Sequence, residues 1–477
     1  MIMIMKMSVS RILCLSRFKS VSANGIQQGQ KTLFFKKFEV FPQLRFLASS
    51  PPPVSSKNVC EVTSSMTHLA ECVRGPTVSN ITQEAAAIQL CHQYGELNTE
   101  EKHDFLKQMS LNEVPNDQRE ATFKRIGQIQ GGVKFLVDMR KDLLDLMKKS
   151  DVSSSQEYVS LKKVNADLRN LLSNWFSVGF LNVEQVTWSS PCSLVEKICN
   201  YEAVHPIVSW TDIKLRLGDS RRVFVFTHPS MPGEPVVILH VALTPGPISD
   251  NVDALVRHPP PSPRGHGTKV KKEDCRAAIF YSVTSTQAGL QGIELGTHLI
   301  KHAVTRLMAE FPQMSTFSTL SPIPGFRTWL IMELTNNSVD HMSALTESEM
   351  NLLKSHFGGK EVFIENLVTS LKTNSWLGNQ ELTSVLKPIL MRLCARYLYQ
   401  EKRRNFALNS VANFHLRNGS CLWRINWLAD SSRRGMLNSC GMMVNYRYFL
   451  DRLETNSNNY LSSHSIDADT QVLDLLK

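Results

Sequence analysis

The sequence predicts an α+β protein with two folded parts: an all-helical N-terminal domain and, after it, a mixed α/β domain. Three observations indicate this class. Apolar residues recur at helical spacing up to about residue 183, strand-like apolar runs begin near residue 184, and strands and helices then share the rest of the chain. The chain has 477 residues, of which 42% are hydrophobic. That length suits about three domains.

The first 60 residues differ in composition from the rest. They contain nine basic residues and one acidic residue, and so carry eight of the chain's ten net positive charges. A basic, acid-poor segment is typical of an organellar presequence; the alternative is a downstream start such as Met66. A run rich in proline and serine at 49–56 predicts a linker. We expect a targeting leader and linker over 1–60 and a mitochondrial matrix location, with the cytosol or peroxisome for a form starting near Met66.

Charge and cysteine content exclude several classes of protein. Beyond the leader the chain is nearly neutral, which gives no electrostatic reason to expect a nucleic-acid partner. The longest apolar run, Val236–Leu243, spans about eight residues, whereas a membrane-spanning helix needs about 20, so we expect no membrane partner. The ten cysteines are scattered without a C-x-x-C pair. This pattern predicts separate thiols in a reducing compartment.

Residues 64–183 are predicted to form the helical domain. Apolar side chains recur three or four residues apart over Leu136–Met147 and Leu161–Trp175. We expect breaks between helices at Asn116-Asp117 and Gly131-Gly132. Because this part contains no cluster of catalytic residue types, we expect it to serve in assembly or as a lid.

Residues 184–477 are predicted to form the catalytic domain, in which strands and helices alternate. Residues 250–273 resemble a long basic loop, and a stretch over about 340–410 is helical in pattern. The expected strands are 222–227, 235–243, 277–283, 314–320, 421–427 and 442–449.

A loop punctuated by glycines follows the strand at 277–283 and leads into a predicted helix. It reads S-T-Q-A-G-L-Q-G-I-E-L-G-T from Ser285 to Thr297. The spacing is neither G-x-G-x-x-G nor a P-loop, but it fits loosely the Q/R-x-x-G-x-G/A pattern of coenzyme A pyrophosphate loops in N-acetyltransferase-like domains. Glycines let backbone N–H groups approach a phosphate, and a helix N-terminus attracts its charge. The alternative is a purely structural glycine turn.

Two other segments carry residue types suited to catalysis. Ser321 opens the motif S-P-I-P-G-F at a predicted strand end, where the prolines stiffen the loop. His415 lies among asparagines in N-F-H-L-R-N-G, before an Asn-Gly turn. Taken singly, each has an ordinary alternative: a serine–proline turn, and a histidine that is merely hydrogen-bonded.

Five motifs follow one another along the second half of the chain. They are S-T-Q-A-G-L-Q-G-I-E-L-G (285–296), S-P-I-P-G-F (321–326), L-M-R-L-C-A-R-Y-L-Y (390–399), N-S-V-A-N-F-H-L-R-N-G (409–419) and L-W-R-I-N-W (422–427). In this order they closely resemble the malonyl-CoA decarboxylase family, and V-T-W-S-S-P-C (186–192) is similar too. The resemblance covers roughly residues 65–470.

The resemblance implies a helical N-terminal domain followed by a catalytic domain of the N-acetyltransferase-like (GNAT-type) fold. It implies the conversion of malonyl-CoA to acetyl-CoA and CO₂ without a metal or redox cofactor, by a homo-oligomer that we expect to be a tetramer. It implies catalytic and substrate-binding roles for Ser321 and His415. It also implies coenzyme contacts from the residues Gln291, Gly292, Ile293, Glu294, Leu295, Gly296 and Thr297.

These residue types suit the chemistry of decarboxylation. Loss of CO₂ from a malonyl thioester leaves an enolate, whose oxygen needs a hydrogen-bond donor and whose α-carbon needs a proton. A histidine that titrates near neutrality can supply the proton, and a serine hydroxyl can bond the carboxylate or the imidazole. Glu294, Tyr446 and Tyr448 are secondary candidates for orienting the pair.

Two other functions stay open: an N-acetyltransferase of the same fold and a non-catalytic acyl-CoA sensor, which fold analogy does not separate from a decarboxylase.

We expect no metal, because His298 and His302 at i, i+4 lack the H-E-x-x-H pattern and a third ligand. Many members of the family end in the peroxisomal signal Ser-Lys-Leu. This sequence ends in Leu475-Leu476-Lys477 instead, which does not favour a peroxisomal location.

Overall fold

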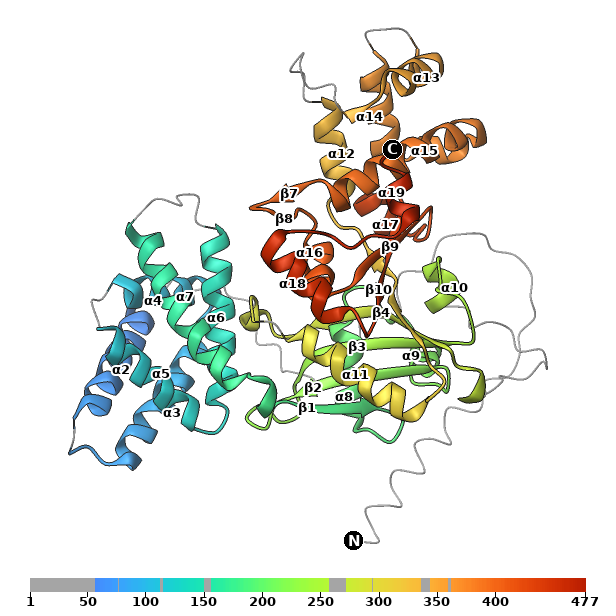
Figure 1. Ribbon diagram of the computed structural model, residues 1–477. Coiled ribbons are helices and arrows are strands. Elements are labelled where there is room, and N and C mark those ends of the chain that lie inside the picture. The colour runs from blue at the N-terminus through green and yellow to red at the C-terminus, as the bar shows by residue number, and fades with distance from the viewer. Residues whose placement is uncertain are drawn as a thin grey trace, which may run out of the picture. The chain divides into compact units, whose positions relative to one another are not determined.

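The computed structural model describes residues 56–75, 77–111, 115–149, 156–256, 272–293, 295–335, 344–358 and 362–477 (Figure 1). Nearly all of the predicted leader lies outside these residues, as does most of the basic loop at 250–273. No helix in the described part of the chain is long and apolar enough to cross a membrane.

Six helices make up the first part of the described chain, and their apolar faces pack together. The stretches that the spacing predicted to be helical are α6 and α7, and Leu136, Leu143, Leu161 and Leu168 are completely buried. The helices are α2 (Ser56–Arg74), α3 (Asn80–Glu96), α4 (Thr99–Leu111), α5 (Asn116–Gln128), α6 (Gly132–Lys149) and α7 (Gln156–Trp175).

An eight-stranded sheet forms the centre of the second part (Figure 1). Its order is β1-β2-β3-β4-β5-β10-β6, with β9 paired to β10. Within it β4 and β5 are parallel, and the other pairs are antiparallel. The strands are β1 (Asn182–Val186), β2 (Arg221–Thr227), β3 (Pro235–Thr244), β4 (Ala277–Ser285), β5 (Thr316–Thr319), β6 (Ser321–Pro322), β9 (Cys421–Asn426) and β10 (Met443–Tyr448).

Helices cover both faces of this sheet. Consecutive residues of β2, such as Phe224 and Val225, point to opposite faces of the sheet and belong to different apolar clusters. The helix α11 (Gly296–Glu310), which connects β4 to β5, packs on the Phe224 side. The helices α8 (Cys192–Tyr201) and α9 (Trp210–Arg216) pack on the other.

The remaining helices form a C-terminal group with its own apolar cluster, which includes Trp376 and Tyr446. The prediction of a helical stretch over about 340–410 is wrong at its end. Residues 402–407 form a two-stranded hairpin, β7 (Lys402–Arg403) and β8 (Phe406–Ala407), whose turn residues have positive φ. The helices are α12 (Phe326–Thr335), α13 (Glu347–Phe357), α14 (Phe363–Thr373), α15 (Gln380–Tyr399), α16 (Ser410–Arg417), α17 (Arg433–Ser439), α18 (Leu453–Ser463) and α19 (Thr470–Asp474).

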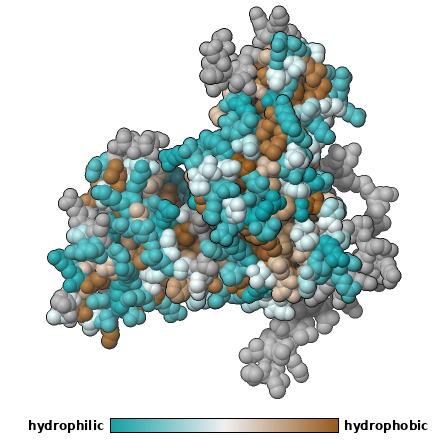
Figure 2. Space-filling model, viewed as in Figure 1, coloured by the Kyte–Doolittle hydropathy of each residue, from teal (hydrophilic) through white to brown (hydrophobic). Residues whose placement is uncertain are grey.

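The predicted succession of a helical region and a mixed α/β region is confirmed. Within the predicted loop at 250–273, the described residues add the short helix α10 (Val252–Val256) and the start of a 3₁₀ helix, η3 (Lys272–Asp274). On the face that Figure 2 shows, hydrophilic residues cover most of the surface and apolar residues are scattered among them. This is the pattern expected when amphipathic helices turn their apolar faces inward.

The helical region packs directly against the glycine loop. The short 3₁₀ helix η4 (Ala288–Leu290) opens this loop and lies on α6. A Cβ atom on Gly289 would stand 1.8 Å from the carbonyl oxygen of Val137, so only glycine permits this approach.

We therefore expect Gly289→Ala to lower the free energy of unfolding by about 2 kcal/mol or more, because its methyl group overlaps helix backbone. Gly95→Ala is the matched control, since a Cβ at Gly95 would meet nothing within 4 Å. Urea-induced unfolding of both variants measures the difference. Equal stability of the two variants would show that α6 does not pack on the loop this closely.

Candidate functional site

Ser321 and His415 are 94 positions apart in the sequence and meet in the folded chain. Ser321 Oγ lies 3.2 Å from His415 Nε2. Ser321 begins β6 opposite Val444 of β10, and His415 lies in the last turn of α16. Only 6% of Ser321 and 4% of His415 are exposed. The structure thus brings together the two residues to which the resemblance assigns catalysis, in a place largely shielded from water.

Asn409 ties the helix that carries His415 to the turn that follows Ser321. Its side-chain oxygen caps α16 by accepting the Ala412 N–H at 2.9 Å, while its Nδ2 donates to the Pro324 carbonyl at 2.8 Å. The Tyr397 hydroxyl donates to the same carbonyl at 3.0 Å. The turn is therefore held from two helices.

The imidazole of His415 belongs to a chain of hydrogen bonds. Its Nδ1 lies 2.8 Å from the Tyr448 hydroxyl, and Ser321 Oγ also donates to Thr319 Oγ1 at 2.9 Å. A neutral imidazole has one N–H donor and one acceptor nitrogen. With the serine hydrogen directed at Thr319, Nε2–H donates to Ser321 and the Tyr448 hydroxyl donates to Nδ1. In the other imidazole tautomer, the Ser321 hydroxyl donates to Nε2 and Nδ1–H donates to the Tyr448 oxygen.

Burial determines the charge state of this site. It lowers the pKa of His415 to about 3, so the free imidazole is neutral at physiological pH. The expectation of titration near neutrality was wrong, because no charged group among the described residues offsets the loss of solvent. Burial also raises the pKa values of Tyr446 and Tyr448, which keeps both hydroxyls protonated.

Tyr446, the other tyrosine candidate, contacts the imidazole by its ring. The rings of Tyr446 and His415 are stacked, with centroids 4.5 Å apart and planes at 25°. Its hydroxyl group is buried and has no hydrogen-bond partner among the described residues. Tyr448 therefore orients the imidazole through a nitrogen, and Tyr446 through its face.

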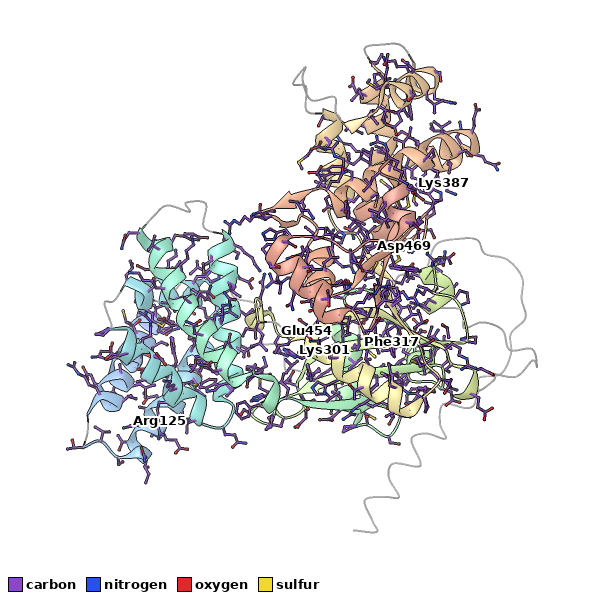
Figure 3. The ribbon with its side chains drawn as sticks, in the orientation of Figure 1. Arg125, Lys301, Phe317, Lys387, Glu454 and Asp469 are labelled. Carbon is purple, nitrogen blue, oxygen red and sulfur yellow. The ribbon has the colours of Figure 1, made fainter. Side chains whose placement is uncertain are left out.

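The strand that leads to Ser321 is interrupted just before it. β10 pairs first with β6 and then with β5, and between these two stretches side chains take the place of backbone-to-backbone hydrogen bonds. The Tyr446 N–H donates to Thr319 Oγ1 at 3.1 Å, and Asn445 Nδ2 donates to the Thr319 carbonyl at 2.7 Å. Figure 3 labels Phe317. Because side chains alternate along a strand, Thr319, two residues later in β5, lies on the same face as Phe317. Thr319 and Ser321 point to the face that carries His415.

The glycine loop presents the residues predicted to bind the coenzyme. Gln291 and Gly292 are exposed, and Gly292 has a φ of +83°, a conformation that favours glycine. Ile293 is half-buried and Leu295 is buried. Leu295, the N-cap residue of α11, provides no side-chain hydrogen bond to the first turn of the helix. Backbone donors and a helix N-terminus form a site for an anion.

One contact joins this loop to the catalytic helix. A Cβ atom on Gly296, the first residue of α11, would lie 3.1 Å from the ring of Phe414, which precedes His415. The glycine thus allows α16 to approach the end of the loop closely. Two predicted residues receive no such placement, since Glu294 and the side chain of Thr297 lie outside the described residues. His298 and His302 belong to no group that could hold a metal ion in the described part of the chain.

A second buried polar cluster lies on the opposite face of the sheet, and sequence reasoning missed it. Glu202 accepts a hydrogen bond from Ser282 at 2.9 Å, and its Oε2 lies 2.9 Å from His240 Nε2. Burial alone would raise the pKa of Glu202, but the hydrogen bonds from His240, the His205 N–H and Ser282 lower it to about 2. No motif signals this cluster, because its members come from separate strands and a loop.

Sequence reasoning also missed Thr319, Asn409 and Phe414. Thr319 had a signal, since it stands two residues before Ser321 in a predicted strand and so shares its face. Asn409 had the signal of a helix N-cap ahead of an apolar run. Phe414 had none, because its role depends on a glycine more than a hundred residues away.

Comparisons with known proteins show which sequences and structures this chain is similar to. Residues 84–176 match the model of the malonyl-CoA decarboxylase N-terminal domain, and residues 179–477 match that of the malonyl-CoA decarboxylase C-terminal domain. The mitochondrial malonyl-CoA decarboxylases of Mus musculus and Rattus norvegicus are 47% and 46% identical over 356 residues, which cover 74% of this chain and 70% of each relative. The crystal structure of malonyl-CoA decarboxylase from Cupriavidus metallidurans matches with a TM-score of 0.70 and 31% identity, over 87% of this chain and 100% of that one.

The burial of His415 predicts a pH dependence of stability. In the unfolded chain the pKa of a histidine is about 6.5, so below that pH the unfolded state binds a proton that the folded state does not. Between pH 7.5 and pH 5, the wild type should therefore lose roughly 2 kcal/mol more unfolding free energy than His415→Gln. Urea-induced unfolding at both pH values measures this difference.

The exposed His356 provides the control. His356→Gln should follow the wild type at both pH values, because its side chain meets water in both states. If His415→Gln loses as much stability on acidification as the wild type, His415 does not titrate differently in the two states.

Proposed function

The chain belongs to the malonyl-CoA decarboxylase family, and on that premise we propose how its residues divide the work of the reaction. The enzyme converts malonyl-CoA to acetyl-CoA and CO₂. The observation that carries the proposal is the Ser321–His415 contact, placed beside a glycine loop and a helix N-terminus suited to an anion.

The glycine loop binds the coenzyme. Residues Gln291 to Thr297 hold the pyrophosphate with backbone amides and the N-terminal turn of α11. Because Phe414 packs on Gly296, the adjacent His415 lies within reach of a thioester that extends from this loop. The loop thus positions the coenzyme so that its malonyl group reaches His415.

Burial of the site favours loss of CO₂. The side chains that surround His415 in the described structure are neutral, and the carboxylate of the substrate leaves water when it enters. Decarboxylation disperses its charge over the thioester enolate, which a poorly solvated site tolerates better than the compact carboxylate. Ser321 Oγ–H donates to the enolate oxygen as the charge develops.

His415 supplies the proton to the α-carbon. The free imidazole is neutral, but a bound carboxylate beside it raises its pKa, because the opposite charge stabilises the imidazolium. The imidazole of His415 therefore takes up a proton when the substrate binds. After CO₂ leaves, Nε2 gives its proton to the α-carbon, and neutral imidazole and acetyl-CoA remain. Tyr448 and Tyr446 are positioning residues for the ring.

The sheet supports the acetyltransferase-like (GNAT-type) fold that the resemblance implies. Strands β1 to β4 form an antiparallel meander, and β4 and β5 are parallel neighbours joined through the glycine loop and α11. Two parallel strands joined through such a loop suit a coenzyme that binds where the first strand ends. We propose domain limits of 64–183 and 184–477.

The cellular setting follows from the relatives and the leader. The mouse and rat proteins are named mitochondrial, and the basic, acid-poor composition of residues 1–60 suits import. We place the enzyme in the mitochondrial matrix. A homotetramer rests on the family resemblance alone.

Release of CO₂ from malonyl-CoA, without an amine acceptor, tests the catalytic pair. His415→Ala and Ser321→Ala should each lower kcat by about 10²–10⁴-fold, the usual effect of removing a general acid or its coupled partner. The double variant should lose much less than the product of the two losses, because both groups act in one step. Coenzyme A affinity should hardly change.

The control is Ser355→Ala combined with His356→Ala, a matched pair at exposed positions. It should retain wild-type turnover. Near-normal turnover by His415→Ala would overturn the assignment of the site, and losses that simply multiply would show that the two residues act in separate steps.

The coenzyme loop has its own test in Gly292→Val. A branched side chain at a φ of +83° strains the backbone and blocks its approach to a phosphate. We expect coenzyme A to bind more weakly by roughly 2 kcal/mol or more, measured by calorimetric titration. Gly358→Val is the control, because Gly358 has a φ of +80° after α13 and nothing within 4 Å. Unchanged affinity in a folded Gly292→Val protein would refute the placement.

A further inference from the structure

Two arginines from the helical region contact the glycine loop of the other region. Arg140 of α6 donates to the carbonyl of Gly289 and, at 2.9 Å, to that of Gln291. Arg169 of α7 donates to the carbonyl of Gly292 at 3.1 Å. Two helices therefore direct guanidinium groups at consecutive turns of the loop that binds the coenzyme.

Arg140 is a buried cation whose partners in the described part of the chain are all neutral. Only 2% of it is exposed, and its third partner is the neutral side-chain oxygen of Asn165 at 3.0 Å. Burial and the nearby charge of Arg169 lower its pKa to about 10, which leaves it protonated at neutral pH. Elsewhere in these helices the buried Arg119 has a carboxylate partner, Asp167.

Arg169 also makes no ion pair with a carboxylate among the described residues, although its side chain is exposed. Its Nε would lie 3.7 Å from a Cβ atom on Gly292, which places the guanidinium beside the exposed part of the loop. The two guanidinium groups are thus close together, and no carboxylate among the described residues forms an ion pair with either of them. Like charges this close repel each other unless an anion compensates them.

The contacts also orient the loop's donors. In a trans peptide the C=O and the following N–H point in opposite directions. Because Arg140 holds the Gln291 carbonyl, the N–H of Gly292 points away from α6. That N–H makes no hydrogen bond among the described residues. The arginines of the helical region therefore donate to carbonyls of the loop, and the Gly292 N–H stays available to an acceptor such as a phosphate oxygen.

We propose that Arg169 of the helical region binds the phosphate groups of the coenzyme A thioester. The helical region is then part of the substrate site, and the missing anion belongs to the substrate. This inference rests on the proposed function, in which the pyrophosphate lies on the loop 291–297. Arg169 contacts the loop at Gly292, whereas α16 approaches it at Gly296, so Arg169 acts on binding and not on the chemical step.

The test compares malonyl-CoA with malonyl-pantetheine, which carries the same thioester and no phosphate. Arg169→Gln should raise the KM for malonyl-CoA about tenfold, the scale of one exposed charge-assisted hydrogen bond, and leave kcat within about twofold. Turnover of malonyl-pantetheine should not change. Arg169→Lys should recover most of the loss, since it restores the charge. Lys163→Gln, an equal charge loss on the same helix, should match the wild type.

Calorimetric titration with coenzyme A separates this inference from the proposed function. The wild type should bind more weakly as salt is raised, and Arg169→Gln should show a smaller dependence on salt. Equal affinities of the wild type and Arg169→Gln would overturn the phosphate contact while the decarboxylase site stands. Equal losses on malonyl-CoA and malonyl-pantetheine would also overturn it, as a purely structural effect. A wild type that binds no coenzyme A would overturn both.

Discussion

The geometry of the site depends on one interruption in the sheet, at Thr319 and Leu320. There the strand that carries Ser321 stops its regular pairing with β10, and two side-chain bonds keep it in place: Thr319 Oγ1 accepts the Tyr446 N–H, and Asn445 donates to the Thr319 carbonyl. Without them, buried backbone groups would lack partners, which costs as much as a lost hydrogen bond. The same Thr319 Oγ1 also accepts a hydrogen bond from Ser321 Oγ, which links the interruption to the catalytic pair.

This arrangement explains how a neutral and buried histidine is positioned against one face of the sheet. Tyr446 and Tyr448 follow the interruption on one face of β10, so one stacks on His415 and the other bonds its Nδ1. From the other direction, α16 is fixed by its cap at Asn409 and by the packing of Phe414 on Gly296. The imidazole is therefore held from the sheet and from the coenzyme loop at once, which couples substrate position to chemistry.

Local signals predicted the elements of the fold well. The strands at 222–227, 235–243 and 277–283 were recognised because buried strands form continuous apolar runs. The hairpin at 402–407 was read as helix because it directly follows α15 and is too short to show a period of its own. Contacts between residues far apart in the sequence left no local pattern from which they could be predicted. Ser321 and His415 were paired only through the family resemblance, and no spacing pointed to Arg140 or Arg169, whose partners lie more than a hundred residues away.

Each face of the sheet carries a buried polar cluster in the described part of the chain, and we assign catalysis to the one that contains Ser321 and His415. The most direct test is a crystal structure with a malonyl-CoA analogue that cannot lose CO₂. We expect the malonyl group within hydrogen-bond distance of Ser321 Oγ and His415 Nε2, with the pyrophosphate over the amides of 291–297. A malonyl group bound instead beside Glu202 and His240, on the opposite face, would contradict it.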